Sequence, residues 1–170
     1  AVNLGVSGTR FKDLYLSGNA IVGGITTNTS GTSNFRAGVN AGNSITSGGN
    51  YNVVVGDEAG TALTIGDSNV VLGYQAGASL TGGNSNVAIG YQALLTEDSY
   101  GANIAIGDSA LKLQDSGATA YNIAIGHEAG SAITTGVQNI LIGGLAGDAI
   151  TDQSNITAVG NTALTANTSG

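Results

Sequence analysis

The sequence predicts an all-β fold, a parallel β-solenoid or β-roll of about eight repeats of 17 residues. The first observation behind this prediction is a glycine that recurs through most of the chain at a nearly fixed spacing. These anchor glycines are Gly38, Gly56, Gly73, Gly90, Gly107, Gly126, Gly143 and Gly160. Self-similarity at a short period is typical of architectures in which each repeat packs only on its neighbours.

The second observation is that the residues around each anchor glycine agree. Four residues before it stands an asparagine: Asn34, Asn52, Asn69, Asn86, Asn103, Asn122 and Asn139. Three residues after it stands an alanine: Ala41, Ala59, Ala76, Ala93, Ala110, Ala129, Ala146 and Ala163. The last repeat departs from the pattern, because Asn155 comes one place early and Ile156 takes its position.

We interpret all three repeated residue types as structural. Glycine permits a positive φ or a close backbone approach. The invariably small alanine indicates a tight contact, and asparagine can hydrogen-bond in a turn or form a ladder along stacked coils.

The third observation is the apolar triplet before each glycine, as in Ile123-Ala124-Ile125 and Ile140-Leu141-Ile142. These mostly β-branched triplets predict short strands. Because the middle residue is apolar as well as its neighbours, we expect both faces of the strand to be buried. One face can pack inside its own coil, and the other needs a second layer, most simply another copy of the chain.

Composition excludes several classes of protein. With 9% charged and 41% hydrophobic residues, the chain is not typical of disordered proteins, and the absence of cysteine rules out a disulfide scaffold. A net charge of −7 argues against nucleic acid as a partner. The apolar runs are too short to cross a membrane, so we expect no membrane insertion.

Residues 1–33 precede the repeats and are predicted to form an N-terminal hairpin and linker, with the repeat domain over residues 34–170. Residues 11–16 alternate apolar with polar side chains, Ser17-Gly18-Asn19 is a turn signal, and residues 20–22 suit a returning strand. Residues 23–33, rich in Gly, Thr, Ser and Asn, suit a linker.

Two places in the repeat domain depart from the common pattern. The first repeat has Phe35-Arg36-Ala37 as its triplet, and we expect it to cap the stack. Two extra residues near positions 117–120 predict a surface bulge. Because the sequence stops part-way through a coil, we expect it to be a fragment of a longer polypeptide.

Two stretches resemble segments of bacteriophage tail fibres. One is the repeat, as in Asn86-Val87-Ala88-Ile89-Gly90-Tyr91-Gln92-Ala93-Leu94, which is similar to the "NTAIGYQAL" arrays of such fibres. The other runs from Asn3-Leu4-Gly5 through Arg10-Phe11-Lys12-Asp13-Leu14-Tyr15-Leu16-Ser17-Gly18. A looser similarity is to the heads of trimeric autotransporter adhesins. The resemblance implies an intimately packed, parallel homotrimer on an extracellular virion fibre.

Candidate catalytic and metal-binding residues are few. The acidic or histidine-containing pairs are Asp57-Glu58, Glu97-Asp98 and His127-Glu128. The first and last occupy variable positions just after an anchor glycine, so we expect them to be solvated. We therefore predict no catalytic residues, no metal site, no cofactor and no enzymatic activity. Tyr74 and Tyr91 are the candidate surface-binding residues, for a glycan.

A further pattern links the fourth and seventh residues after each anchor glycine, called here positions +4 and +7. Five repeats pair glycine with a large apolar residue: Gly42/Ile45, Gly60/Leu63, Gly77/Leu80, Gly130/Ile133 and Gly147/Ile150. Three pair leucine with a polar residue: Leu94/Glu97, Leu111/Gln114 and Leu164/Asn167. The pattern predicts one apolar pocket in each coil, filled from either side of a turn.

These observations favour a structural function: a rigid segment of a trimeric tail fibre that supports host attachment, with neighbouring fibre or tail proteins as partners. The alternative is an adhesin whose repeat exterior binds a bacterial or host glycan or protein directly. A third class, a glycan-cleaving tailspike, is disfavoured because no pair of acids is predicted to converge.

Overall fold

The computed structural model describes residues 30–166, and these contain eight short strands and no helix. The strands are β1 (Phe35–Ala37), β2 (Val53–Val55), β3 (Val70–Leu72), β4 (Val87–Ile89), β5 (Ile104–Ile106), β6 (Ile123–Ile125), β7 (Ile140–Ile142) and β8 (Thr157–Val159). Each is the triplet that precedes an anchor glycine, apolar throughout in β2–β7. The predicted N-terminal hairpin lies outside the described residues.

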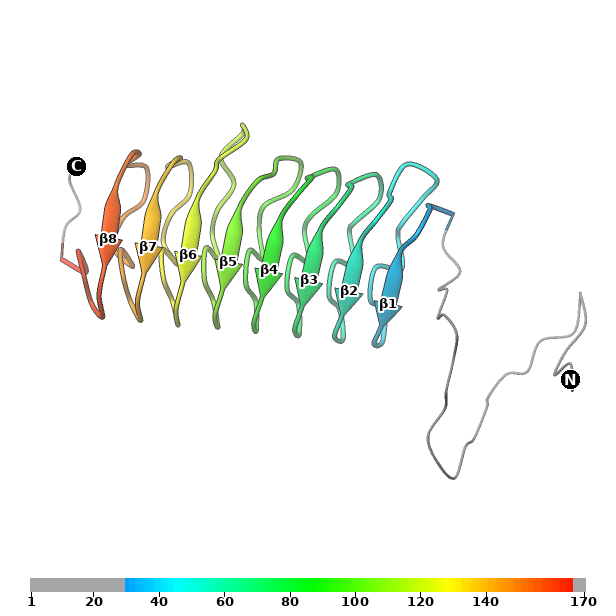
Figure 1. Ribbon diagram of the computed structural model, residues 1–170, viewed down its shortest axis with the longest axis horizontal. Helices are drawn as coiled ribbons and strands as arrows, with labels where there is room; N and C mark the ends of the chain where they lie inside the picture. The colour runs from blue at the N-terminus through cyan, green and yellow to red at the C-terminus, as the bar shows by residue number, and fades with distance from the viewer. Residues whose placement is uncertain (1–29, 167–170) are drawn as a thin grey trace, which may run out of the picture.

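The strands form one parallel sheet in the order β1 to β8, each paired with the next in sequence. Equivalent repeat positions pair directly, as in Val87 with Ile104 and Ile89 with Ile106. Figure 1 shows the strands side by side along an elongated stack, with the connecting loops completing each coil. This confirms the parallel β-solenoid; the eight strands enclose seven complete steps of about 17 residues.

Each strand buries only one of its faces within this chain. The middle residue points into the coil and is buried, as for Val54, Ala88 and Leu141. The first and third residues point outward and stay partly exposed. The sequence predicts that both faces of each strand are covered. Within this chain only the inner face is covered, because a coil with one strand has no second layer to cover the outer face.

The core is a column of small and large apolar residues inside the coils. The alanines three residues after the anchor glycines are buried from Ala41 to Ala146. Beside them lie the large side chains of the +4/+7 pattern: Ile45, Leu63, Leu80, Leu94, Leu111, Ile133 and Ile150. Each coil from the first to the seventh thus contributes one such side chain, as the pattern predicts.

The asparagines form the predicted ladder inside the stack. The backbone N–H of each donates to the side-chain oxygen of the asparagine one coil earlier, for example Asn69 to Asn52 at 2.9 Å. Except in Asn103, the side-chain amide donates to a carbonyl about a coil further on, as Asn69 does to Gly83 at 2.8 Å. In the last repeat Ile156 occupies the ladder position and donates its N–H to Asn139, so the side-chain ladder ends there.

The anchor glycines are required by the backbone. All eight have φ between +126° and +139°, a region that other residues rarely adopt. Consecutive anchor glycines also stack so closely that a Cβ on Gly90 would overlap the carbonyl oxygen of Gly107. Both predicted roles of the glycine, positive φ and close approach, are confirmed.

The two irregular repeats differ in the expected places. In β1 the half-buried Arg36 takes the inward position, and its Nη1 donates to the Gly42 carbonyl at 2.8 Å across the end of the core. Between β5 and β6 the extra residues form the bulge that rises above the other loops in Figure 1. Gly117, one of the residues between β5 and β6, has no atom close enough to touch a Cβ.

Candidate functional site

The acidic pairs predicted to be solvated lie on the outer surface and do not converge on a catalytic site. Asp57 and His127 are exposed. Glu58 accepts a hydrogen bond from Gln75 Nε2 at 2.7 Å, and Gln92 Nε2 donates to Gln75 Oε1 at 2.8 Å. These side chains therefore continue the stacking of the coils on the outside.

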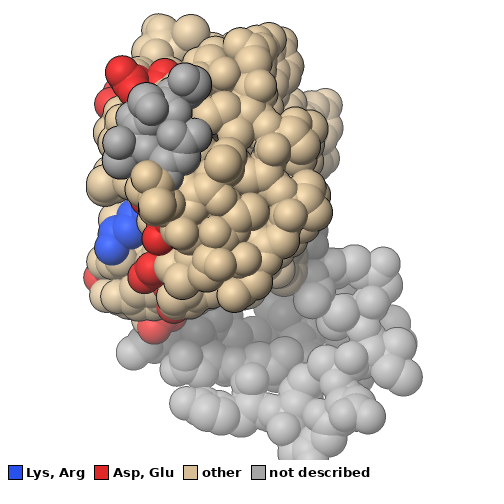
Figure 2. All heavy atoms as spheres, turned by 90° about the vertical axis from the view of Figure 1, so that its left-hand side faces the viewer, with Lys and Arg blue, Asp and Glu red and all other residues tan. Residues whose placement is uncertain are grey.

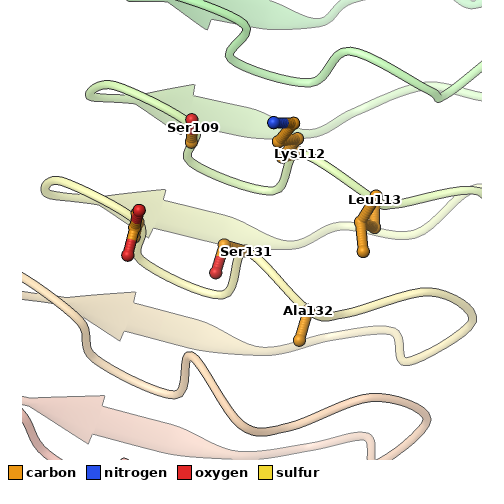
Figure 3. A pocket seen from close by; sticks show the side chains of 6 residues that line it. Ser109, Lys112, Leu113, Ser131 and Ala132 are labelled. Atoms are coloured by element: carbon orange, nitrogen blue, oxygen red, sulfur yellow. The ribbon is translucent and has the colours of Figure 1, made fainter.

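The hollows of the described surface are shallow. One of about 290 Å³ lies on two neighbouring coils and is lined by Ser109, Lys112, Leu113, Glu128, Ser131 and Ala132. Figure 3 shows its side chains standing on the outside of adjacent loops. The lining includes two serine hydroxyls and no histidine.

Tyr74 and Tyr91 are brought together by the repeat. They occupy the same position in adjacent coils, and their rings stack with centroids 5.7 Å apart and planes 17° from parallel. Both rings are exposed. The nearby Glu58 carboxylate raises the pKa of the Tyr74 hydroxyl. Exposed, paired aromatic rings next to hydrogen-bonding groups are a feature of ligand-binding surfaces.

The outer strand face is a further candidate surface. The in-register sheet aligns the outward residues of β2–β7 in two rows, which we call the apolar columns: Val53, Val70, Val87, Ile104, Ile123 and Ile140 in one, and Val55, Leu72, Ile89, Ile106, Ile125 and Ile142 in the other. None of these residues is polar. Val53 keeps 37% of its surface exposed and Ile140 38%.

The charged side chains gather on one side of the stack (Figure 2). In the view along the stack from its β8 end, Figure 2 shows the acidic and basic side chains on one side, while the opposite side is uncharged. Aligned, partly exposed apolar side chains such as those of the apolar columns mark interaction sites in soluble proteins. The apolar columns are therefore suited to contact another protein surface.

One buried acidic residue was not predicted from the sequence. Glu97, at position +7 of its repeat, is fully buried, and burial raises the pKa of its carboxyl to about 7. Asp98 and Asp115 lie beside it. One feature of the sequence does point to it: Glu97 and Gln114 stand at position +7, which is apolar in five other repeats.

The twenty predicted repeat positions lie as the repeat requires. The six asparagines from Asn52 to Asn139 are fully buried, the anchor glycines carry the positive φ, and the alanines pack in the core except Ala163, which is partly buried. Among residues 30–166 no helix is long and apolar enough to cross a membrane.

Comparison with known proteins yields no match to a family model, a curated protein or a solved structure.

Proposed function

We propose that this chain is a structural segment of a trimeric bacteriophage tail fibre, which holds a host-attachment part away from the virion. The observation that carries the proposal is the pair of apolar columns on the outside of β2–β7. A monomer would leave these aligned Val, Leu and Ile side chains in water. Association of identical chains through this face would remove them from it.

The interior of the coil supports a mechanical role. Each coil is tied to the next by strand pairing, by the buried asparagine ladder and by the stacked anchor glycines. Because these contacts repeat at every coil along one axis, the segment resists bending along its whole length. The trimeric state and the location on an extracellular virion come from the resemblance to tail-fibre arrays. Neighbouring fibre or tail proteins would be the other partners.

The second candidate function is direct adhesion through the repeat exterior. The stacked Tyr74–Tyr91 pair favours it, because sugar rings pack on exposed aromatic side chains and hydrogen-bond to groups beside them. The flanking Glu58 and Gln92 side chains offer such groups.

A glycan array probed with the full chain, beside a Tyr74→Ala/Tyr91→Ala variant, separates the two functions. A purely structural segment gives no sugar-specific signal with either protein. Submicromolar binding to one sugar class by the unchanged chain, lost in the double variant, would overturn the structural proposal and support the adhesin.

A further inference from the structure

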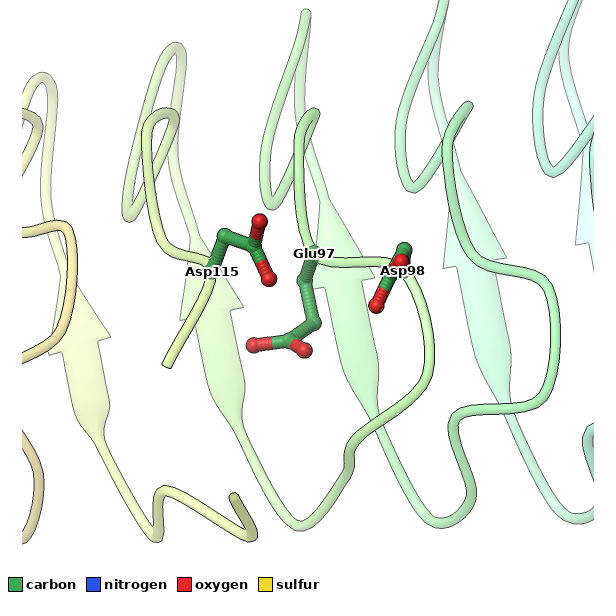
Figure 4. A group of neighbouring side chains, drawn as sticks. All are labelled: Glu97, Asp98 and Asp115. Carbon is green, nitrogen blue, oxygen red and sulfur yellow. The ribbon is translucent and has the colours of Figure 1, made fainter. Parts of the chain in front are cut away.

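Three carboxylates from two adjacent coils meet at one place in the stack. Glu97 and Asp98 belong to the coil that begins with β4, and Asp115 belongs to the coil that begins with β5. One carboxylate oxygen from each lies within 4.8 Å of those of the other two. Figure 4 shows the Glu97 side chain extending inward between the two aspartates.

Glu97 is the unusual member of the group. Its side chain is fully buried. Oε1 accepts a hydrogen bond from the Tyr100 N–H at 3.2 Å, and the Ser116 backbone N–H also stabilises the carboxylate, but Oε2 makes no hydrogen bond of normal geometry. Among residues 30–166 no basic side chain forms an ion pair with it. A buried, ionised carboxylate with an unsatisfied oxygen and two acidic neighbours is strongly unfavourable unless a cation compensates it.

Asp98 and Asp115 stand where the other coils have a threonine. The position after +7 is threonine in most repeats, and its hydroxyl donates to a carbonyl of the next coil, as Thr64 does to Thr81 at 3.0 Å. Thr81 likewise donates to the Asp98 carbonyl at 3.0 Å. Ionised aspartates cannot continue this ladder as donors. The change to aspartate occurs in the two coils that also carry Glu97 and Gln114 at +7.

We propose that Glu97, Asp98 and Asp115 bind a calcium ion that joins the coils beginning with β4 and β5. Ca²⁺ prefers carboxylate and carbonyl oxygens at about 2.3–2.6 Å, so oxygens on opposite sides of the ion lie roughly 4.6–5.2 Å apart. The three carboxylate oxygens lie within 4.8 Å of one another, close enough to share one such ion. Mg²⁺ demands near-ideal octahedral geometry at about 2.0–2.1 Å and gives up its waters reluctantly, so a buried group of few carboxylates suits it less.

The unpartnered oxygen of Glu97 supports the same site. A calcium ion would bind the buried Oε2 and offset the charge of the three carboxylates at the same time. The prediction from the sequence that the chain has no metal site did not consider Asp115, which is 18 residues from Glu97 and is brought beside it by coil stacking.

The next coil offers a matched, uncharged version of the site. Gln114 occupies the position equivalent to Glu97, and its Oε1 accepts a hydrogen bond from Asn122 Nδ2 at 2.6 Å. Asn103 is the equivalent of Asn122 for Glu97, and its Nδ2 has no partner. Glu97→Gln therefore keeps the size of the side chain, offers Asn103 an acceptor and removes the charge that calcium needs.

The test uses the full chain, freed of metal with a chelator and then titrated with calcium chloride alone, followed by calorimetric titration and by thermal unfolding. We expect calcium to bind at millimolar concentration or below and to raise Tm, with magnesium having a much smaller effect. Glu97→Gln and Asp115→Asn should each weaken calcium binding by at least about tenfold. Asp152→Asn, an exposed aspartate in the coil that begins with β7, should leave binding unchanged.

Three results would overturn the proposal. The first is that calcium does not shift the Tm of the unchanged chain. The second is that magnesium shifts this Tm as much as calcium does. The third is a full calcium response in a folded Glu97→Gln variant, since binding would then come from scattered surface carboxylates. Far-ultraviolet circular dichroism establishes that the Glu97→Gln variant is folded.

Discussion

Each anchor glycine meets two constraints at once, a positive φ and a neighbouring backbone in the place of its missing side chain. We expect Gly90→Ala to lower the free energy of unfolding by more than the roughly 1–3 kcal/mol that a strained φ alone costs, because the Cβ would also overlap the Gly107 carbonyl. Urea unfolding followed by circular dichroism measures the change.

Gly82→Ala is the matched control for this substitution. Its φ lies outside the positive range, and a Cβ there would meet Ile65 Cγ1 at an ordinary 3.5 Å. This variant should unfold within about 0.5 kcal/mol of the unchanged chain. Equal stability of the two variants would show that the anchor turn tolerates a side chain.

The buried carboxyl of Glu97 predicts a dependence of stability on pH when no metal is bound. Its pKa is raised from 4.5 to about 7 on folding, so between these pH values the folded protein holds a proton that the unfolded chain has released. The contribution of Glu97 to stability is therefore full below pH 4.5, falls as pH rises and is lost above about pH 7. The integrated loss is about 3 kcal/mol.

Glu97→Gln should remove this contribution. In the presence of a chelator, we expect the variant to be more stable than the unchanged chain at about pH 8 and to differ much less at about pH 4.5. Urea unfolding at the two pH values gives the comparison. A stability difference that does not change with pH would mean that Glu97 titrates normally in the folded protein.

Within a coil, positions +4 and +7 share one space. A Cβ on Gly77 would lie 2.8 Å from Leu80 Cδ1, and one on Gly147 would lie 3.0 Å from Ile150 Cδ1. The polar partner in the other type of coil is not expelled to the surface, however. Glu97 and Gln114 are fully buried beside Leu94 and Leu111, so the pocket holds one large apolar side chain and one polar one.

The shared space predicts coupling between two substitutions. Leu94→Gly should cost about 2 kcal/mol or somewhat more for the lost side chain, partly offset because Leu94 has a φ of +51° that glycine adopts without strain. Adding Glu97→Leu recreates the Gly77/Leu80 arrangement and should recover much of that loss. A double-mutant cycle in chelator measures the coupling, and simple additivity would show two separate sites.

The regular parts of the coil could be predicted from the sequence because they repeat. The triplets gave the strands, and the recurring Asn, Gly and Ala gave the ladder, the turn and the small core position. The left-handed backbone of Glu58, Gln75 and Leu94 could not be predicted, since none of these residue types favours a positive φ. The stacked coils impose that conformation at equivalent positions, whatever the side chain.

The acidic group of Glu97, Asp98 and Asp115 escaped sequence analysis for a related reason. Asp115 is a full coil away from Glu97 and Asp98, and only the alignment of adjacent coils brings it beside them. The burial of Glu97 was equally hidden, because a polar residue in a repeat is more often solvated. Equivalent positions in neighbouring repeats have to be compared in pairs before such a group is visible.

For the molecule as a whole, the sheet leaves its outer face without a second layer. The sequence predicted that this face needs a cover, and the apolar columns remain partly exposed in the single chain. Substituting glutamate for Ile106 places a charge in the middle of one column, where association would have to bury it. Ile65→Glu is the matched control, because Ile65 is 60% exposed and lies outside the columns.

Sedimentation equilibrium at micromolar concentration tests the proposed association most directly. We expect the unchanged chain and Ile65→Glu to sediment with three times the mass of the 16.5 kDa chain, and Ile106→Glu to sediment as a smaller species. A folded, unchanged chain that sediments as a monomer would contradict it, because the apolar columns would then be stable in water without a partner.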